Sequence, residues 1–414
     1  MNSKLFSKDF TLVVIGQIIS LFGNATIRFV LPLYLLNLTG SSALYGTVTA
    51  CAFIPAILLS PVGGIVADRV NKRNIMVLLD FFTAMVILAF SILMNGINLI
   101  FLLTVTLMLL YGIAGAYQPS VQASIPALVT QDNFMVANSI INTISSLAAL
   151  AGPVLGGILY SAYGLMPILQ VCMVCFAASA VMEIFIKIPC QKQDVKGGIL
   201  KAAGADLAES IRFIRKEKPA LGKALFVICG INLFLSAMIL VALPYLVTEV
   251  LNLEASQANR LYGFAEGVLA AGGLTGGISA GVFAGKLTIH KSDILIAACA
   301  VCVFPISASL ILFSSGMINY IVITVCCFII MVFSTIFTVQ MMSFVQRETP
   351  QALIGKVIAV MLTVSMCAQP LGNAFYGVLF EICKGFEFVV ILFSGTASLI
   401  IAISARNIFR GFSE

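Results

Sequence analysis

The sequence predicts an all-α membrane protein with twelve transmembrane helices in two pseudo-symmetric six-helix halves. Of its 414 residues, 60% are hydrophobic and only 10% are charged, whereas soluble proteins average about 25% charged residues. The apolar residues fall into continuous runs of roughly 20 residues or more, the length that crosses a hydrocarbon core of about 30 Å. Because these runs do not alternate between apolar and polar residues, an outer-membrane β-barrel is excluded.

Several short motifs recur at a spacing of 217 residues, which indicates an internal repeat. The repeat predicts an N-terminal six-helix half at residues 1–188, a cytoplasmic linker at 189–219 and a C-terminal six-helix half at 220–414. The recurring features are Leu44-Tyr45-Gly46 with Leu261-Tyr262-Gly263, Gly64 with Gly281, and Pro153 with Pro370.

Twelve apolar runs mark the expected spans, six in each half. The first run is too long for the hydrophobic region of a signal peptide, so we expect it to form an uncleaved helix. The N-terminal spans are expected at residues 10–37, 43–67, 75–94, 98–122, 138–162 and 165–188, and the C-terminal spans at 220–248, 258–285, 293–314, 317–345, 354–382 and 386–406.

The basic residues predict the orientation of the chain. With the N-terminus inside the cell, 20 of the 23 Lys and Arg residues fall in cytoplasmic loops and helix ends, while Arg260 and Lys384 fall outside and Arg28 lies within the first span. This distribution satisfies the positive-inside rule. We therefore expect a multi-pass protein of the cell (plasma or inner) membrane with both termini cytoplasmic, and the net charge of +6 requires no nucleic-acid partner.

The linker between the halves contains a segment with helical periodicity. Its apolar residues follow helical spacing and its basic residues lie on other faces, which predicts a short amphipathic helix at the cytoplasmic membrane surface. A plain solvated linker is the alternative. The apolar positions are Leu200, Leu207, Ile211 and Ile214.

We expect no cofactor and no metal. The eleven cysteines lie mostly within apolar runs, so the pairs Cys172/Cys175 and Cys299/Cys302 do not indicate a disulfide framework. The only histidine, His290, falls in a loop and gives little support to a metal site. The sequence contains no nucleotide-binding signature and no nucleophile–base arrangement, so we expect neither ATP hydrolysis nor an enzyme.

Three motifs carry a resemblance to a known family. The segment Gly64-x-x-x-Asp68-Arg69-x-x-Lys72-Arg73 resembles the signature between the second and third helices of the major facilitator superfamily, with Asn71 in place of the usual glycine. The segment Gly152-Pro153-Val154-Leu155-Gly156-Gly157 resembles the fifth-helix signature of drug/proton antiporters, although Ala148 stands where an upstream glycine is usual. The run Leu38-Thr39-Gly40-Ser41 resembles the macrolide-efflux-like branch.

The first motif is a candidate gate formed by Gly64, Asp68, Arg69 and Arg73. A carboxylate at the C-terminal end of a helix is unfavourable next to the helix dipole, so Asp68 requires a positive partner. The resemblance implies that this partner is the start of the eleventh helix, and that the contact forms in one conformation and breaks in the other. The alternative is that these charges only fix topology. The second repeat has Gly285 in place of the acid, so we expect an asymmetric gate.

The second motif predicts close packing between helices. Pro153 removes one backbone hydrogen bond and kinks the fifth helix, while Gly152, Gly156 and Gly157 allow another backbone to approach. We expect the partner to be the eighth helix. Its matching face would present Gly273, Gly277, Gly281 and Gly285, one glycine every fourth residue. Tight packing with no gating role is the alternative.

The resemblance implies that the cavity is lined mainly by the first helix of each three-helix unit, which here means spans one, four, seven and ten. The mixture of aromatic, amide and methionine side chains in these spans suits a bulky amphiphilic substrate, because flexible methionine surfaces adapt to different partners. The candidate residues are Asn24, Arg28, Tyr111, Tyr117, Gln118, Asn232, Phe234, Gln340 and Met341, with Gln369 and Asn373 from the eleventh span.

Ionisable residues inside spans are candidates for proton coupling, because they are costly in a membrane unless they have a function. Glu266 is the leading candidate, since burial favours the protonated carboxyl and Arg28 could pair with it. The alternative for that pair is a permanent structural salt bridge. Asp80 and Glu183 are further candidates, for which simple salt bridges with Arg73 or Arg69 and with Lys187, respectively, are the alternatives.

Together the motifs predict a secondary transporter that exports hydrophobic or amphiphilic drugs or antibiotics by alternating access, coupled to protons. Its expected partners are a small amphiphilic substrate, protons and the lipid bilayer, and we expect it to act as a monomer. A lipid or lysolipid translocator, or an exporter of an amphiphilic, siderophore-like metabolite, is the alternative. A membrane sensor that uses this fold without transport is a hypothesis of a different class.

Overall fold

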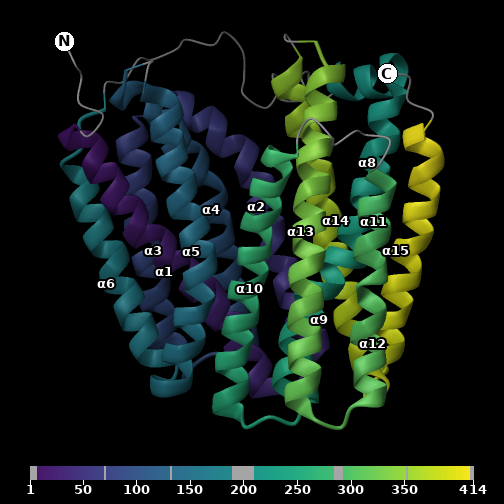
Figure 1. Ribbon diagram of the computed structural model, residues 1–414. Coiled ribbons are helices and arrows are strands. Elements are labelled where there is room, and N and C mark those ends of the chain that lie inside the picture. The colour runs from purple at the N-terminus through teal and green to yellow at the C-terminus, as the bar shows by residue number, and fades with distance from the viewer. Residues whose placement is uncertain are drawn as a thin grey trace. The chain divides into compact units, whose positions relative to one another are not determined.

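The computed structural model describes residues 7–69, 71–130, 133–188, 209–283, 292–350 and 353–410, and all regular elements within them are helical (Figure 1). The N-terminal helices are α1 (Lys8–Thr39), α2 (Ser42–Arg69), α3 (Lys72–Leu93), α4 (Leu99–Leu128), α5 (Phe134–Tyr163) and α6 (Leu165–Ile184). The C-terminal helices are α8 (Pro219–Ile231), α9 (Ala237–Tyr245), α10 (Ala255–Val282), α11 (Ser292–Val301), α12 (Val303–Leu312), α13 (Gly316–Glu348), α14 (Ile354–Ile382) and α15 (Glu387–Arg410).

Every predicted span corresponds to one helix or to consecutive helical segments, so the all-α membrane fold is confirmed. The seventh span is built from α8, the π-helical turn η3 (Asn232–Ser236), α9 and a second π-helical turn, η4 (Leu246–Val250). The ninth span is α11 followed by α12, which are separated at Cys302. Single π-helical turns inside α-helices are rare and occur often at functional sites.

The eighth span, α10, is less hydrophobic than the others. Within the described residues, eleven helical segments are long and apolar enough to cross a membrane, and α10 is not one of them. Its many glycines together with Arg260 and Glu266 lower its mean hydropathy. Its 28 residues nevertheless span about 40 Å at 1.5 Å per residue, which is sufficient to cross a bilayer.

The chain divides into two compact units, each of which includes a segment from the other half of the sequence. Unit 1 comprises residues 1–38, 51–196 and 255–267, and unit 2 comprises residues 39–50, 197–254 and 268–414. In unit 1, α3 packs against α6 and α4. In unit 2, α15 packs against α11 and α12, and α14 packs against α9 and η3. The division of the sequence at residues 188 and 220 stays a prediction.

In each unit, two helices cross at a pair of glycines. In unit 1, a Cβ added at Gly157 of α5 would lie 2.8 Å from the carbonyl oxygen of Asn259 in α10 and close to Gly263. In unit 2, a Cβ added at Gly377 of α14 would lie 2.7 Å from the carbonyl oxygen of Ser42 in α2 and close to Gly46. Real Cβ atoms do not approach this closely, so both crossings require glycine.

The predicted contact face of α10 is wrong. A Cβ added at Gly277 or Gly281 would meet no atom within 4 Å, and at Gly273 it would make only ordinary contacts with α13. The glycines of α10 in close contact are Gly263 and Gly267 against α5, and Gly272 and Gly276 against α13. A spacing of four residues drifts around a helix of 3.6 residues per turn, so the spacing alone does not identify the face that packs. Gly285 lies outside the described residues.

Of the glycines in the second motif, Gly157 packs against α10 as predicted, whereas Gly152 and Gly156 pack against α1. A Cβ at Gly152 would clash with Ala25, and a Cβ at Gly156 would lie 3.0 Å from the ring of Phe29. The carbonyl of Pro153 lies next to Gly263 of α10. The fifth helix therefore contacts both α1 and α10 through this motif.

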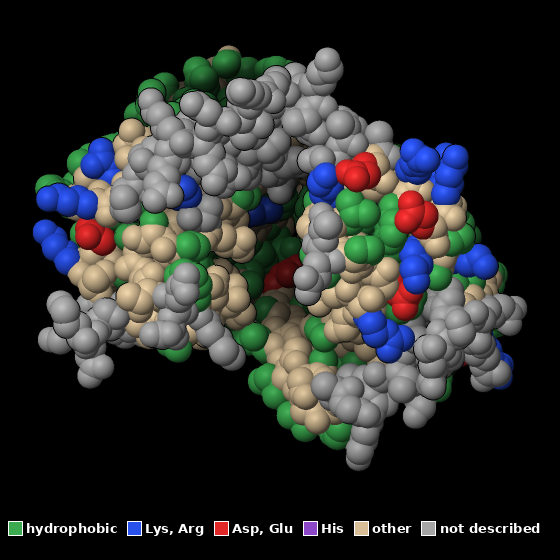
Figure 2. Space-filling model, turned by 90° about the horizontal axis from the view of Figure 1, so that it is seen from above, with side chains coloured by type: hydrophobic (Ala, Val, Ile, Leu, Met, Phe, Trp, Pro, Cys, Tyr) green, Lys and Arg blue, Asp and Glu red, His purple; other side chains and the backbone are tan. Residues whose placement is uncertain are grey.

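Basic residues gather at one end of each unit, on the face seen in Figure 2. In unit 1, Lys8 begins α1 and Lys72 begins α3, while Lys187 follows the end of α6. In unit 2, Lys218 pairs with Glu348 at 2.7 Å and Lys356 pairs with Glu209 at 2.8 Å. This pattern is the one from which the orientation was predicted, and the placement of the termini in the cytoplasm stays a prediction.

Two predicted features lie partly or wholly outside the residues that the structure describes. Of the predicted amphipathic helix, Leu200 and Leu207 lie outside the described residues, and Ile214 falls in the π-helical turn η2 (Phe213–Glu217). The candidate gate residues Gly64, Asp68 and Arg69 lie in the last turns of α2, where only the backbone is described.

Candidate functional site

Two acidic side chains lie buried in the interior of unit 1, held by a hydrogen-bond network from four helices. Asp80 of α3 is 2% exposed and Glu183 of α6 is fully buried. The Ser20 hydroxyl of α1 donates to Asp80 Oδ1 at 2.9 Å. The Tyr117 hydroxyl of α4 donates to Glu183 Oε1 at 2.8 Å, and Gln17 Nε2 of α1 donates to the Tyr117 oxygen at 2.8 Å. We call these five residues the acid network.

The predicted salt bridges of Asp80 with Arg73 and of Glu183 with Lys187 are wrong, while the side chain of Arg69, the other predicted partner of Asp80, lies outside what the structure describes. Arg73 lies seven residues before Asp80, which places it about 10 Å away along α3, and its Nε donates to Asn74 instead. Glu183 is not paired with Lys187 because α6 ends at Ile184, so the four-residue spacing between them is not helical. The Lys187 backbone N–H donates to Asp9 Oδ1 at 3.0 Å. Among the described side chains, no Lys or Arg forms a salt bridge with either acid.

The acid network contains more hydrogen-bond acceptors than donors. Gln17 Oε1, Asp80 Oδ2 and Glu183 Oε2 are all buried and accept no hydrogen bond. The Ser179 hydroxyl lies beside Asp80 but donates to the carbonyl of Gly16. Unpaired buried polar atoms are rare in folded proteins and each costs free energy, so three in one place call for an explanation.

Arg28 and Glu266 do not form the predicted ion pair. The guanidinium of Arg28 instead stacks on the ring of Tyr111 at 3.5 Å from the ring centre. Glu266 is only partly buried and interacts with the side chain of Tyr262, one turn earlier on α10. Stacking on an aromatic face satisfies a guanidinium without a counterion, which sequence spacing could not reveal.

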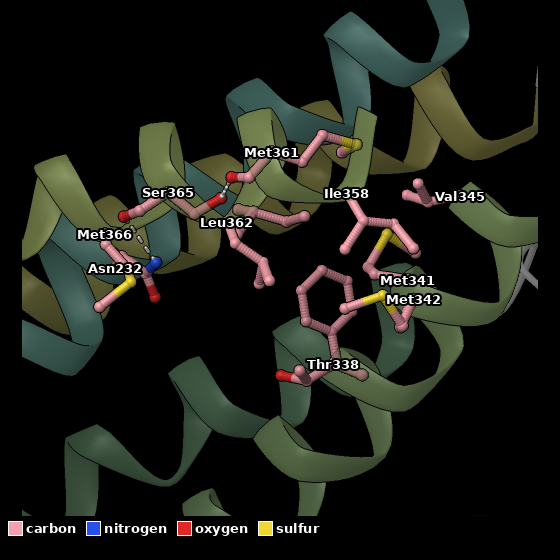
Figure 3. A pocket seen from close by; sticks show the side chains of 12 residues that line it. Asn232, Thr338, Met341, Met342, Val345, Ile358, Met361, Leu362, Ser365 and Met366 are labelled. Carbon is pink, nitrogen blue, oxygen red and sulfur yellow. Dashed lines mark hydrogen bonds between the residues drawn. The ribbon is translucent and has the colours of Figure 1, made fainter. Parts of the chain in front are cut away.

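Unit 2 contains a cavity of about 200 Å³ between α8 with η3, α13 and α14 (Figure 3). Its polar lining atoms are already occupied in part, since Asn232 Nδ2 donates to the Ser365 carbonyl at 3.0 Å and the Ser365 hydroxyl donates to the Met361 carbonyl at 2.6 Å. None of the described residues that line it is charged. The lining residues are Ile228, Asn232, Phe337, Thr338, Met341, Met342, Val345, Ile358, Met361, Leu362, Ser365 and Met366.

Of the predicted cavity residues, the structure brings Asn232 and Met341 together at this cavity. Several others have different partners. Gln340 accepts a hydrogen bond from Ser292 at 2.9 Å, and Gln369 donates to Asn373 at 3.2 Å. The Phe234 ring packs edge-on against Phe393. Gln340, Gln369, Asn373 and Phe234 are not among the residues that line the cavity.

The remaining predicted cavity residues lie in unit 1. Tyr117 belongs to the acid network and is 4% exposed. Tyr111 lies under Arg28 and packs edge-on against Phe53. The Asn24 amide donates to the carbonyl of Ser20, and Gln118 Oε1 is buried without a partner. The structure therefore places Tyr117 in the acid network and Arg28 against the ring of Tyr111.

Sequence analysis missed Gln17 and Ser20 in the acid network and ten of the twelve residues that line the cavity of unit 2. Gln17 and Ser20 are polar residues one turn apart in the first apolar run, a spacing that would have placed both on one face of the helix. The additional cavity residues include Met342, Met361 and Met366, whose grouping within two spans was a usable signal.

Residues 13–373 match the model of the Major Facilitator Superfamily. The chain belongs to the Major Facilitator Superfamily. Among curated relatives, it is 21% identical over 365 residues to macrolide efflux protein A of Streptococcus pyogenes, a match that covers 86% of this chain and 85% of that protein. It is 29% identical over 187 residues to the lysophospholipid transporter LplT of Escherichia coli, covering 45% of each chain. This superfamily member is also 31% identical over 155 residues to the multidrug resistance protein MdtG of Citrobacter koseri, covering 35% of this chain and 37% of that protein.

Solved transporter structures share the fold of this superfamily member. The nucleoside transporter NupG matches with a TM-score of 0.78 at 12% identity, covering 98% of this chain and all of that chain. A bacterial homologue of the iron transporter ferroportin in an inward-facing state matches with a TM-score of 0.71 at 17% identity, covering 96% of this chain and 98% of that chain. As a member of the Major Facilitator Superfamily, the protein is a multi-pass membrane transporter and not an enzyme.

Proposed function

We propose that the protein exports hydrophobic or amphiphilic compounds of the drug or antibiotic class by alternating access, with proton uptake as the driving reaction. The methionine-lined cavity of unit 2 carries this proposal. Methionine side chains are flexible and polarisable, so they pack against apolar surfaces of different shapes. The cavity has no charged lining residue to select a sugar phosphate or an inorganic ion.

The similarity to macrolide efflux protein A supports this substrate class, because it extends over most of both chains. A second candidate function is translocation of lysophospholipids. The similarity to the lysophospholipid transporter favours it, although that match covers less than half of each chain. A siderophore-like amphiphilic metabolite remains a third substrate hypothesis of the same export type.

Proton coupling is supported by the acidic residues within the spans, Asp80, Glu183 and Glu266. Carboxyl groups inside a membrane protein exchange protons when their surroundings change, and this exchange can bias a transport cycle. The gate that completes the cycle would be the end of α2 at Asp68, with Arg69 and Arg73.

A drug-susceptibility panel in an efflux-deficient host tests the proposed substrate class. We expect cells that express the protein to tolerate several bulky amphiphilic antibiotics and to accumulate less of a fluorescent amphiphile while the membrane is energised. Reconstituted vesicles with a fluorescent lysolipid separate the second candidate, for which lipid transfer would exceed drug transport. Unchanged susceptibility and unchanged dye accumulation at verified expression would contradict export and favour a sensor.

A further inference from the structure

We infer that the acid network is the proton-binding site of the transporter, with Asp80 and Glu183 sharing protons and with Gln17 and Tyr117 as positioning residues. This inference rests on the proposed proton coupling and names the site at which it occurs. It differs from the expectation based on the sequence, which favoured Glu266 and did not include Gln17.

The direction of the hydrogen bonds in the network leaves one acceptor of Gln17 without a donor. Tyr117 has a single hydroxyl proton, which goes to Glu183 Oε1. The Tyr117 oxygen must therefore accept, and only the amide nitrogen of Gln17 can donate to it. This fixes the orientation of the Gln17 amide, and its Oε1 is left as a buried, unpaired acceptor.

A proton on a carboxyl group supplies the missing donor. The three unpaired atoms of the network are all oxygens, and two of them belong to carboxyl groups. Protonation of Asp80 Oδ2 or Glu183 Oε2 converts one unpaired acceptor into a donor, so the network then has one acceptor fewer and one donor more. The hydrogen-bond pattern therefore matches a network that holds at least one proton in this conformation.

Among the described side chains of unit 1, no cation pairs with the acids in place of a proton. The helices of unit 1 that contact the network are α1, α3, α4 and α6, and α4 carries no charged residue. On α1, Arg28 is stacked on Tyr111, and Asp9 binds the backbone of Lys187. The other charged residues on these helices are Lys8 at the start of α1 and Lys72 and Arg73 at the start of α3. Two ionised carboxylates in this interior would have no compensating charge among the described side chains, which is strongly unfavourable.

Glu266 does not share these features. It is partly exposed and none of its oxygens is an unpaired buried atom. Its partner Tyr262 lies one turn away on the same helix, so a movement between helices would not break that interaction. It is the natural control for the acid network.

The network connects the proton site to the position of α1. Both Gln17 and Ser20 lie on α1, whereas the two acids lie on α3 and α6. The helices are in close contact, because a Cβ added at Gly16 would lie 3.4 Å from Glu183 Oε1 and one at Gly23 would lie 3.2 Å from the Phe176 ring. A displacement of α1 by more than a hydrogen-bond length would break the Ser20–Asp80 bond and the Gln17–Tyr117 bond together, so the protonation of the network and the position of α1 are linked.

Infrared difference spectroscopy on the full-length protein in lipid vesicles tests proton binding without any substrate. We expect a protonated-carboxyl C=O band that appears as pH is lowered, and we expect Asp80→Asn and Glu183→Gln to diminish or remove it while Glu266→Gln retains it. A band that persists in both network variants and disappears in Glu266→Gln would overturn the proposal. This measurement needs no transported compound, so it tests the proton site even where the proposed substrate class is wrong.

Transport in proteoliposomes tests whether this proton is used. Under an imposed pH gradient, Asp80→Asn and Glu183→Gln should lose at least tenfold of the accumulation while substrate exchange without a gradient persists. Gln17→Leu and Tyr117→Phe should displace the midpoint of the pH profile by about one pH unit, which a merely structural role would not do. An accumulation driven by a Na⁺ gradient, with no infrared band at any pH, would identify an alkali-cation site and overturn the proposal.

Discussion

The interiors of the two units contain different buried polar groups. In unit 1, the buried polar residues include two acids without counterions and three unpaired acceptor atoms. In unit 2, the buried hydrogen bonds described above join neutral groups, as in the pair Ser292–Gln340 and in the bond from Asn232 to the Ser365 carbonyl. Unit 2 also contains unpaired buried atoms, including Gln340 Nε2 of this pair and Asp293 Oδ1, but the acid network gathers two acids and three such acceptors, which an added proton would help to satisfy.

This difference shows what a sequence repeat does and does not specify. The corresponding helices of the two halves match in order and approximate length, because membrane thickness and the repeat set both. The polar chemistry has diverged, since α15 carries no acidic residue after Glu387 in its first turn, whereas its counterpart α6 carries Glu183 near its end. A repeat therefore predicts where helices lie and not which unit binds an ion.

The largest effect is expected from Asp68→Asn, which tests whether the two repeats also differ at the gate. Asp68 has no acidic counterpart, because Gly285 occupies its position in the second repeat. We expect the variant to insert normally and to lose most of its transport activity, measured as dye export at equal expression. Export equal to that of the original protein would show that the charge only contributes to topology.

Gly157→Leu tests whether the glycine crossing of unit 1 is as tight as the distances indicate. A leucine there would meet the backbone of α10, and overpacking of this kind typically costs about 1–3 kcal/mol. We expect a lower melting temperature of the purified protein and a lower yield. Gly277→Leu is the matched control, because a Cβ at Gly277 meets nothing within 4 Å. Equal losses in both variants would contradict the assigned crossing.

Met342→Trp tests whether the cavity of unit 2 binds the transported compound. The added ring volume should fill part of a cavity of about 200 Å³ and reduce export of bulky compounds several-fold, with smaller compounds less affected. Val339→Trp on the same helix is the control, since Val339 is 41% exposed and does not line the cavity. The comparison is made by dose–response in cells at equal expression.

The smallest effects are expected from Ser292→Ala and Glu183→Gln, which compare the stability contributed by the two kinds of buried polar pair. Removing the Ser292 hydroxyl leaves Gln340 Oε1 unpaired, which should destabilise unit 2 by about 1 kcal/mol. Glu183→Gln keeps an acceptor for Tyr117 and removes a buried ionisable group, so the melting temperature should stay the same or rise. A marked loss of stability in Glu183→Gln would show that the acid network is structural.

The sequence predicted the helices better than their side-chain partners. The twelve spans follow from the lengths of the apolar runs alone. The segment that forms α11 and α12 was predicted by the same rule, although as a single span. The partners of Arg28 and Asp80 come from other helices, and no rule of spacing within one run could identify them. The salt bridge expected between Glu183 and Lys187 failed for a local reason, since the helix ends between them.

The low hydropathy of α10 has a consequence for how the chain enters the membrane during synthesis. Insertion of a helix by the translocation machinery depends on its own hydrophobicity, and the glycines, Arg260 and Glu266 make α10 a poor substrate for that step. Gly272 and Gly276 pack against α13, which is made later. We infer that stable insertion of α10 waits for the helices that follow it, so chains truncated before α13 should leave this segment accessible to labelling from the aqueous phase.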